Sequence, residues 1–201
     1  MPRDDNQLDG PKRRVPRRVP RPLKFAFSER KALEALAYIA IQWPGITPFY
    51  LSKVFFYGEK QHLNKYGRPI VADTYIAMPR GPVPSTVKDI VDENFEHVDA
   101  PEEFDRFIKI EHTRYKSVYS RVREEDLQHL TASDKECLDA AIAFCKGKGI
   151  DELMYITHLE KAWANAAVNR PMNYEDFIDD DNPHKEQVLA SAREFAAYGV
   201  L

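Results

Sequence analysis

Glu59 and His62 are the two residues of this sequence that are best spaced for metal chemistry. On a helix, a separation of three residues places a carboxylate and an imidazole on one face, as in the Glu-x-x-His pairs of di-iron proteins. Such a site requires a second pair and two further glutamates, and the nearest candidate, Asp126 with His129, lies in an expected loop. We therefore interpret Glu59 and His62 as the polar edge of a half-buried helix, and we predict neither a metal nor another cofactor.

The other residue types that could support catalysis lack the partners they would need. The segment 80–84, Arg-Gly-Pro-Val-Pro, contains two prolines, which remove the N–H donors of a phosphate-binding turn. Ser85 lacks the Gly-x-Ser-x-Gly context of a hydrolase nucleophile. Cys137 and Cys145 would lie about 12 Å apart along one helix, too far for a disulfide, and we interpret them as small core residues. The sequence therefore predicts a protein that is not an enzyme.

The helix that would carry Glu59 and His62 has clear start and stop signals. Thr47 suits the N-cap position, Pro48 suits the first helical position, and Gly67 suits the left-handed residue that ends a helix. Helical spacing then predicts one buried face and one solvent face. The expected buried face comprises Leu51, Val54, Phe55, Gly58 and His62, and the expected solvent face comprises Lys53, Lys60 and Gln61.

The segment after this helix predicts a strand, a turn and a second helix. Alternating apolar residues from Ile70 to Ile76 indicate a short, half-buried strand. The tripeptide Gly81, Pro82 and Val83 indicates a rigid structural turn, because proline and glycine fix the backbone without side-chain packing. A helix with Val87, Ile90, Val91 and Phe95 on its buried face is expected next.

The rest of the chain predicts an α+β fold, mainly helical, with a small antiparallel β-sheet in a single domain of residues 25–201. The acidic run 175–181 is expected to be a solvated loop and not a cation site, and a surface that meets a basic partner is the alternative. The remaining expected elements are a helix after Ser28, hairpin strands at 107–112 and 117–122, a helix opened by a capping box at 133–136, one or two helices within 150–167, and a last helix opened by Asn182 and Pro183.

The first 24 residues differ from the rest in composition and charge. They contain five prolines, and eight Lys or Arg against three Asp give them a net charge of +5 in a chain of −3. So few apolar residues predict a disordered basic tail. The clustered arginines suit contact with nucleic acid, but the tail lacks the interleaved aromatic residues of a single-strand-binding surface. Two roles therefore remain open: a solubilising or partner-docking tail, and a tail that contacts nucleic acid. No apolar run reaches the length of a signal-peptide core or a membrane span, which predicts a cytoplasmic protein without membrane contact.

His158 and Trp163 lie five residues apart in a segment expected to be helical. On one straight helix their side chains would project about 140° from each other, so we do not expect their rings to stack. We interpret His158 as a structural residue that hydrogen-bonds to a backbone carbonyl or a carboxylate, and Trp163 as a residue that closes the core. A catalytic or ligand-binding histidine is the alternative.

Two groups of motifs, about seventy residues apart, carry a family resemblance. The first group is Tyr66-Gly67, Tyr75-Ile76-Ala77 and Gly81-Pro82-Val83. The second is Tyr155-Ile156-Thr157-His158, followed by Trp163. In this order they resemble the signature of the Panacea domain, the SocA-like antitoxin family of bacteria and their phages. The resemblance covers roughly residues 28–198.

This resemblance implies an antitoxin that neutralises a cognate toxin by direct protein–protein contact. A proteolytic-adaptor mode, in which the antitoxin delivers the toxin to a cellular protease, is also associated with the SocA type. The alternative hypothesis is a nucleic-acid-binding regulator that uses the arginine-rich tail. Tyr75 and Arg80 are the candidate toxin-binding residues, because they flank a rigid turn and a fixed backbone loses little entropy on docking.

Overall fold

The computed structural model describes residues 22–96 and 101–199. The prediction of a mainly helical fold with small antiparallel strands is confirmed, although the strands form two separate hairpins and not one sheet. Residues 1–21, where the disordered tail is predicted, lie outside the described residues. The elements are α1 (Glu29–Gln42), α2 (Pro48–Tyr66), β1 (Tyr75–Met78), β2 (Gly81–Pro84), α3 (Ser85–Val91), α4 (Pro101–Phe107), β3 (Ile108–His112), β4 (Lys116–Ser120), α5 (Ala132–Lys146), α6 (Ile150–Leu159), α7 (Lys161–Ala164) and α8 (Lys185–Tyr198), with short 3-10 turns at Glu124–Asp126 and Tyr174–Phe177.

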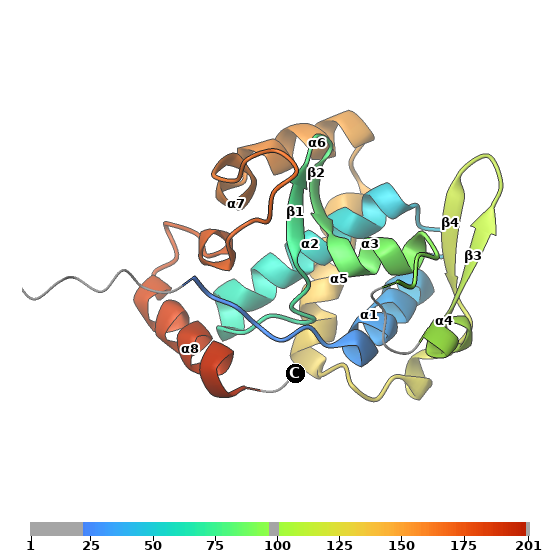
Figure 1. Cartoon of the computed structure of the whole chain (residues 1–201), viewed down its shortest axis with the longest axis horizontal. Helices are drawn as coiled ribbons and strands as arrows, with labels where there is room; N and C mark the ends of the chain where they lie inside the picture. The colour runs from blue at the N-terminus through green and yellow to red at the C-terminus, as the bar shows by residue number, and fades with distance from the viewer. Residues whose placement is uncertain (1–21, 97–100, 200–201) are drawn as a thin grey trace, which may run out of the picture.

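Helix α2 runs through the middle of the molecule, between α5, α8 and the β1–β2 hairpin (Figure 1). Its predicted ends are confirmed: Pro48 is its first residue, and Gly67 ends it at φ 68°. The predicted buried face is confirmed as well, but the helix is buried beyond that face. Lys53, expected in solvent, is only 1% exposed, because the β1–β2 hairpin covers it.

The predicted strand at 70–76 begins late. Strand β1 starts only at Tyr75, and the preceding residues form a loop. The carboxylate of Glu59 accepts the N–H groups of Ile70, Val71 and Ala72 at 2.7–3.2 Å, so these amides cannot pair in a strand ladder. Ala72 also has a positive φ of 62°. A buried side chain from α2 therefore shapes this loop.

The predicted turn at Gly81, Pro82 and Val83 is a strand. These residues form β2, which pairs antiparallel with β1 so that Met78 faces Gly81 and Tyr75 faces Pro84. The chain reverses one step earlier, at Pro79 and Arg80. The positive φ expected at Gly81 is confirmed, with a value of 96°. Strand β2 then leads directly into α3, as Figure 1 shows.

Several other elements differ in detail from the sequence expectations. The hairpin β3–β4 is confirmed, whereas α4, just before it, was not expected. Helix α5 is capped by Thr131 with Asp134, two residues before the predicted box at Ser133. The acidic run near 175–181 is not a purely solvated loop, because it contains a 3-10 turn and buries Phe177 and Ile178.

The buried residues form two clusters. The larger one lies between α1, α2, α3 and α5, and it includes both cysteines, as expected. Burial raises the pKa of the Cys137 thiol to about 11 and that of Cys145 to about 12. The smaller cluster joins α2 to α7 and α8, and it includes Leu23, which was assigned to the tail but is only 6% exposed. Among the described residues, no helix combines the length and the hydrophobicity needed to cross a bilayer.

Candidate partner-binding face

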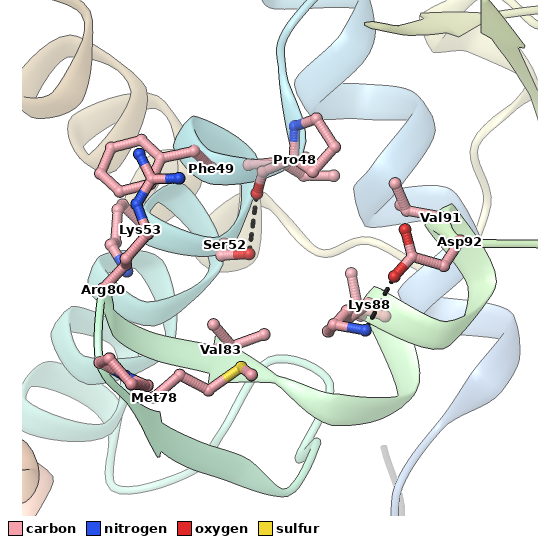
Figure 2. A pocket seen from close by; sticks show the side chains of 13 residues that line it. Pro48, Phe49, Ser52, Lys53, Met78, Arg80, Val83, Lys88, Val91 and Asp92 are labelled. Atoms are coloured by element: carbon pink, nitrogen blue, oxygen red, sulfur yellow. Dashed lines mark hydrogen bonds and ion pairs between the residues drawn. The ribbon is translucent and has the colours of Figure 1, made fainter. Parts of the chain in front are cut away.

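A pocket of about 380 Å³ lies where the β1–β2 turn approaches the first turn of α2 and helix α3 (Figure 2). Most of its lining is apolar. The N-terminus of α2, the hairpin and α3 each supply one wall. The lining residues are Pro48, Phe49, Leu51, Ser52, Lys53, Met78, Pro79, Arg80, Val83, Val87, Lys88, Val91 and Asp92.

Two cations share one end of this pocket. The guanidinium of exposed Arg80 lies 5.1 Å from the centre of the Phe49 ring, and the ammonium of Lys53 lies at the same distance from it. Figure 2 shows Arg80 over the ring, with Lys53 below. Burial, together with the nearby Arg80 charge, lowers the pKa of Lys53 to about 7. Cation–π contact holds the Arg80 head at the edge of the pocket.

Lys53, Gly81 and Thr157 come together behind the pocket. The Lys53 ammonium donates a hydrogen bond of 3.1 Å to the carbonyl of Pro82. A Cβ atom on Gly81 would lie 2.5 Å from the Thr157 hydroxyl and 2.7 Å from the Lys53 nitrogen. Only glycine fits between these two side chains. This close approach joins the two groups of motifs, since Gly81 belongs to the first and Thr157 to the second.

The second group also holds the hairpin through Trp163. Its indole N–H donates to the carbonyl of Met78 at 3.0 Å. The expectation that His158 and Trp163 do not stack is wrong: their ring centroids lie 3.8 Å apart with an interplanar angle of 14°. The two rings can meet because they do not lie on one straight helix: the helix is interrupted at Glu160, between α6 and α7. The expected hydrogen bond of His158 to a backbone carbonyl or a carboxylate is not formed at Nε2, which is buried and has no hydrogen-bond partner among the described residues.

Tyr75 lies in the smaller buried cluster and does not line the pocket. It is 1% exposed, and its ring packs against Phe56 and Phe177 with centroids 6.1 and 5.3 Å away. In this structure it presents no surface to a partner, so the candidate toxin contact rests on Arg80. The Tyr75 ring instead anchors strand β1 to α2.

Glu59 and His62 are both fully buried and have structural partners. Burial raises the pKa of Glu59, although three backbone N–H groups and the Tyr174 hydroxyl, which donates at 2.9 Å, favour its charged form. Nδ1 of His62 donates to the carbonyl of Arg68 at 2.8 Å, and burial lowers its pKa to about 4. Across the described residues, no group of three or more His, Cys, Asp or Glu side chains is arranged to hold a metal ion.

Sequence reasoning missed Lys53 and Phe49 as parts of this face. Helical spacing assigned Lys53 to solvent, because a periodic pattern cannot show that a helix is covered on several sides. One signal was present: Phe49 and Lys53 are four residues apart, the spacing at which a cation and a ring meet on a helix. That spacing is common on helices, so it does not identify a site without knowledge of how the hairpin packs on α2.

The fold thus defines a mainly helical protein in which two distant motif groups meet at one hairpin. The family model described as "Antitoxin SocA-like, Panacea domain" matches residues 51–164. The chain belongs to this family, and membership implies a cognate toxin as its partner. No curated protein and no solved structure matches the chain.

Proposed function

We propose that this protein is a non-enzymatic antitoxin that neutralises its toxin by direct contact, through the face around the β1–β2 turn. The observation that carries this proposal is the convergence of both motif groups on the hairpin that presents Arg80. The matched segment contains Lys53, Arg80 and Thr157, and it contains every residue that lines the pocket except Pro48 and Phe49.

The physical properties of this face suit a protein partner. The turn is held from behind by Trp163 and by Lys53, so little backbone freedom is lost on docking. Arg80 offers a charged, planar head fixed over an aromatic ring, and arginine is enriched among residues that dominate binding energy. The apolar lining beside it provides surface that a partner side chain can bury.

Co-expression with the toxin encoded beside this gene tests the proposal. The wild-type protein should restore growth and should be recovered in a stable complex, whereas Arg80→Ala should weaken both. Arg114→Ala is a matched control, since Arg114 also lies next to a hairpin turn over an aromatic ring, 5.4 Å from the centre of Tyr115. Equal rescue by both variants would show that Arg80 does not contribute to the toxin contact. If the protein encoded by the neighbouring gene is not toxic and forms no complex with this protein, the proposed antitoxin function is wrong.

The proteolytic-adaptor mode makes a separate prediction about the toxin itself. Neutralisation by blocking leaves the amount of toxin in the cell unchanged, whereas delivery to a protease shortens its half-life. A translation-blocked chase of the toxin, with and without this protein, distinguishes the two modes.

The alternative function, nucleic-acid binding, depends on the tail. Deleting residues 1–22 removes most of its positive charge while retaining Leu23, which is buried in the smaller cluster. If the tail contacts nucleic acid, binding by the full chain should weaken steeply with salt and should be lost on deletion. Rescue by the deleted form would show that the antitoxin function does not need the tail.

A further inference from the structure

The pocket beside Arg80 has the distribution of polarity expected of a ligand site. Its long walls are formed by aliphatic side chains from α2, β2 and α3, namely Leu51, Val83, Val87 and Val91, together with Met78. Its positive charge gathers at the end where Lys53 and Arg80 face the Phe49 ring. Its volume of about 380 Å³ lies at the lower end of the range of small-molecule sites.

Within the described residues, the positive end of the pocket has no counter-charge. Neither Lys53 nor Arg80 forms an ion pair with any carboxylate in the part of the chain that the structure describes. The acid that lines the pocket, Asp92, is already paired with Lys88 at 2.8 Å and with Lys116 at 2.6 Å, at the opposite end (Figure 2). The N-terminus of α2, at Pro48, opens on the same space and adds the positive end of its dipole.

We propose that this pocket binds a small organic carboxylate with an apolar body. The carboxylate would lie between the Lys53 ammonium and the Arg80 guanidinium, and the apolar body would lie along the aliphatic walls. A phosphate fits less well, because Pro48 and Pro79 lack the N–H groups that cradle such an anion. The proposal does not depend on the antitoxin function, because it concerns the isolated protein.

The protonation of Lys53 gives this binding a measurable signature. The groups around its ammonium are Arg80 on the hairpin turn and Cys145 on α5, with Thr157 on α6 and the Lys88–Asp92 pair across the pocket. Cys145 is a neutral thiol at neutral pH, since burial raises its pKa to about 12. The one anion among these groups is Asp92, which is paired with Lys88 and Lys116 at the opposite end of the pocket. An incoming carboxylate would therefore raise the pKa of Lys53, and binding above pH 7 would be accompanied by proton uptake.

Titration calorimetry with octanoate on the full-length protein tests the proposal. At pH 8, in two buffers of different ionisation enthalpy, binding should take up close to one proton per octanoate. Octanamide, which has the same chain but no charge, should bind at least about tenfold more weakly and without proton uptake. N-acetylleucine mimics the end of a peptide chain and should bind more weakly than octanoate.

Lys53→Met keeps the buried stem but removes the ammonium, so it should abolish proton uptake and weaken octanoate binding about tenfold or more. Arg80→Gln should weaken binding but leave the proton uptake in place. Lys109→Met, on the exposed face of β3, is the control and should bind like the wild type. Circular dichroism and thermal unfolding of each variant verify that the fold is intact.

Three results would overturn the proposal. The first is no octanoate binding at millimolar concentration by the wild type. The second is equal binding of octanoate and octanamide, which would show that the cations do not recognise the ligand. The third is binding of N-acetylleucine alone, which would assign the pocket to the end of a protein chain. None of these results bears on growth rescue, so the antitoxin function is judged separately.

Discussion

The imidazole of His158 lies flat against the indole of Trp163, with ring centroids 3.8 Å apart. The stack joins the end of α6 to the short helix α7. On its other side, Trp163 donates its N–H to the carbonyl of Met78, the last residue of β1. Trp163 therefore connects α6 and α7 to the hairpin that carries Arg80.

Trp163→Phe should destabilise the protein and loosen the hairpin. Phenylalanine keeps an aromatic ring but cannot donate to the Met78 carbonyl, so we expect a loss of about 1–3 kcal/mol in the free energy of unfolding. Urea unfolding measures it. Trp43→Phe is the control, because the Trp43 indole makes no hydrogen bond among the described residues. Equal losses in both variants would show that the bond to Met78 contributes nothing.

Gly81→Ala should be costly for two independent reasons. The φ of 96° is unfavourable for any residue with a Cβ, and that Cβ would lie 2.5 Å from the Thr157 hydroxyl. We expect a loss of about 2–4 kcal/mol, and a larger one for Gly81→Val. Gly147→Ala is the matched control, since a Cβ there meets nothing within 4 Å. An unchanged melting temperature for Gly81→Ala would contradict the hairpin geometry.

Glu59→Gln should release the loop before β1. The amide side chain offers one acceptor oxygen where the carboxylate accepts from three backbone N–H groups and Tyr174. We expect a loss of about 3 kcal/mol, since buried donors are left without partners. Hydrogen exchange at Ile70, Val71 and Ala72 should accelerate, whereas Glu152→Gln on the exposed face of α6 should leave these amides protected. Unchanged exchange would show that Glu59 does not fix the loop.

Lys53→Met should stabilise the protein in a pH-dependent way. Burial lowers the pKa of Lys53 to about 7, whereas an unfolded lysine titrates near pH 10.4. Between these pH values the unfolded chain holds a proton on Lys53 that the folded chain has lost. The free energy of unfolding of the wild type therefore rises with pH over this range. The advantage of Lys53→Met should therefore be about 2–3 kcal/mol larger at pH 7 than at pH 9. Urea unfolding at both pH values measures it, and the opposite trend would contradict the assignment.

Local signals in the sequence predicted the elements well where a single residue controls the backbone. Gly67 and Pro48 mark the ends of α2 because their conformational limits act without tertiary contacts. The loop before β1 could not be predicted in this way. It depends on the Glu59 carboxylate, more than ten residues upstream, and an alternating pattern carries no information about that contact.

The candidate site was predictable only in part, for the same reason. The motifs indicated the hairpin and Arg80, but the break at Glu160 has no proline or glycine to signal it. Without that break, a straight helix separates His158 from Trp163, and the sequence gives no reason to bring the rings together. The burial of Tyr75 and Lys53 follows from how the hairpin packs on α2, which is a property of the whole fold.

The pairing of β1 determines when, during synthesis on the ribosome, this part of the fold can be completed. One edge of β1 pairs with β2, but the other pairs with residues made about ninety positions later, through bonds from Ala77 to Arg170 at 3.0 Å and from Met172 to Tyr75 at 2.8 Å. Contacts of such long sequence separation form late in folding. The face around Arg80 is therefore completed only when most of the chain has left the ribosome, and a nascent chain does not yet carry the proposed binding face.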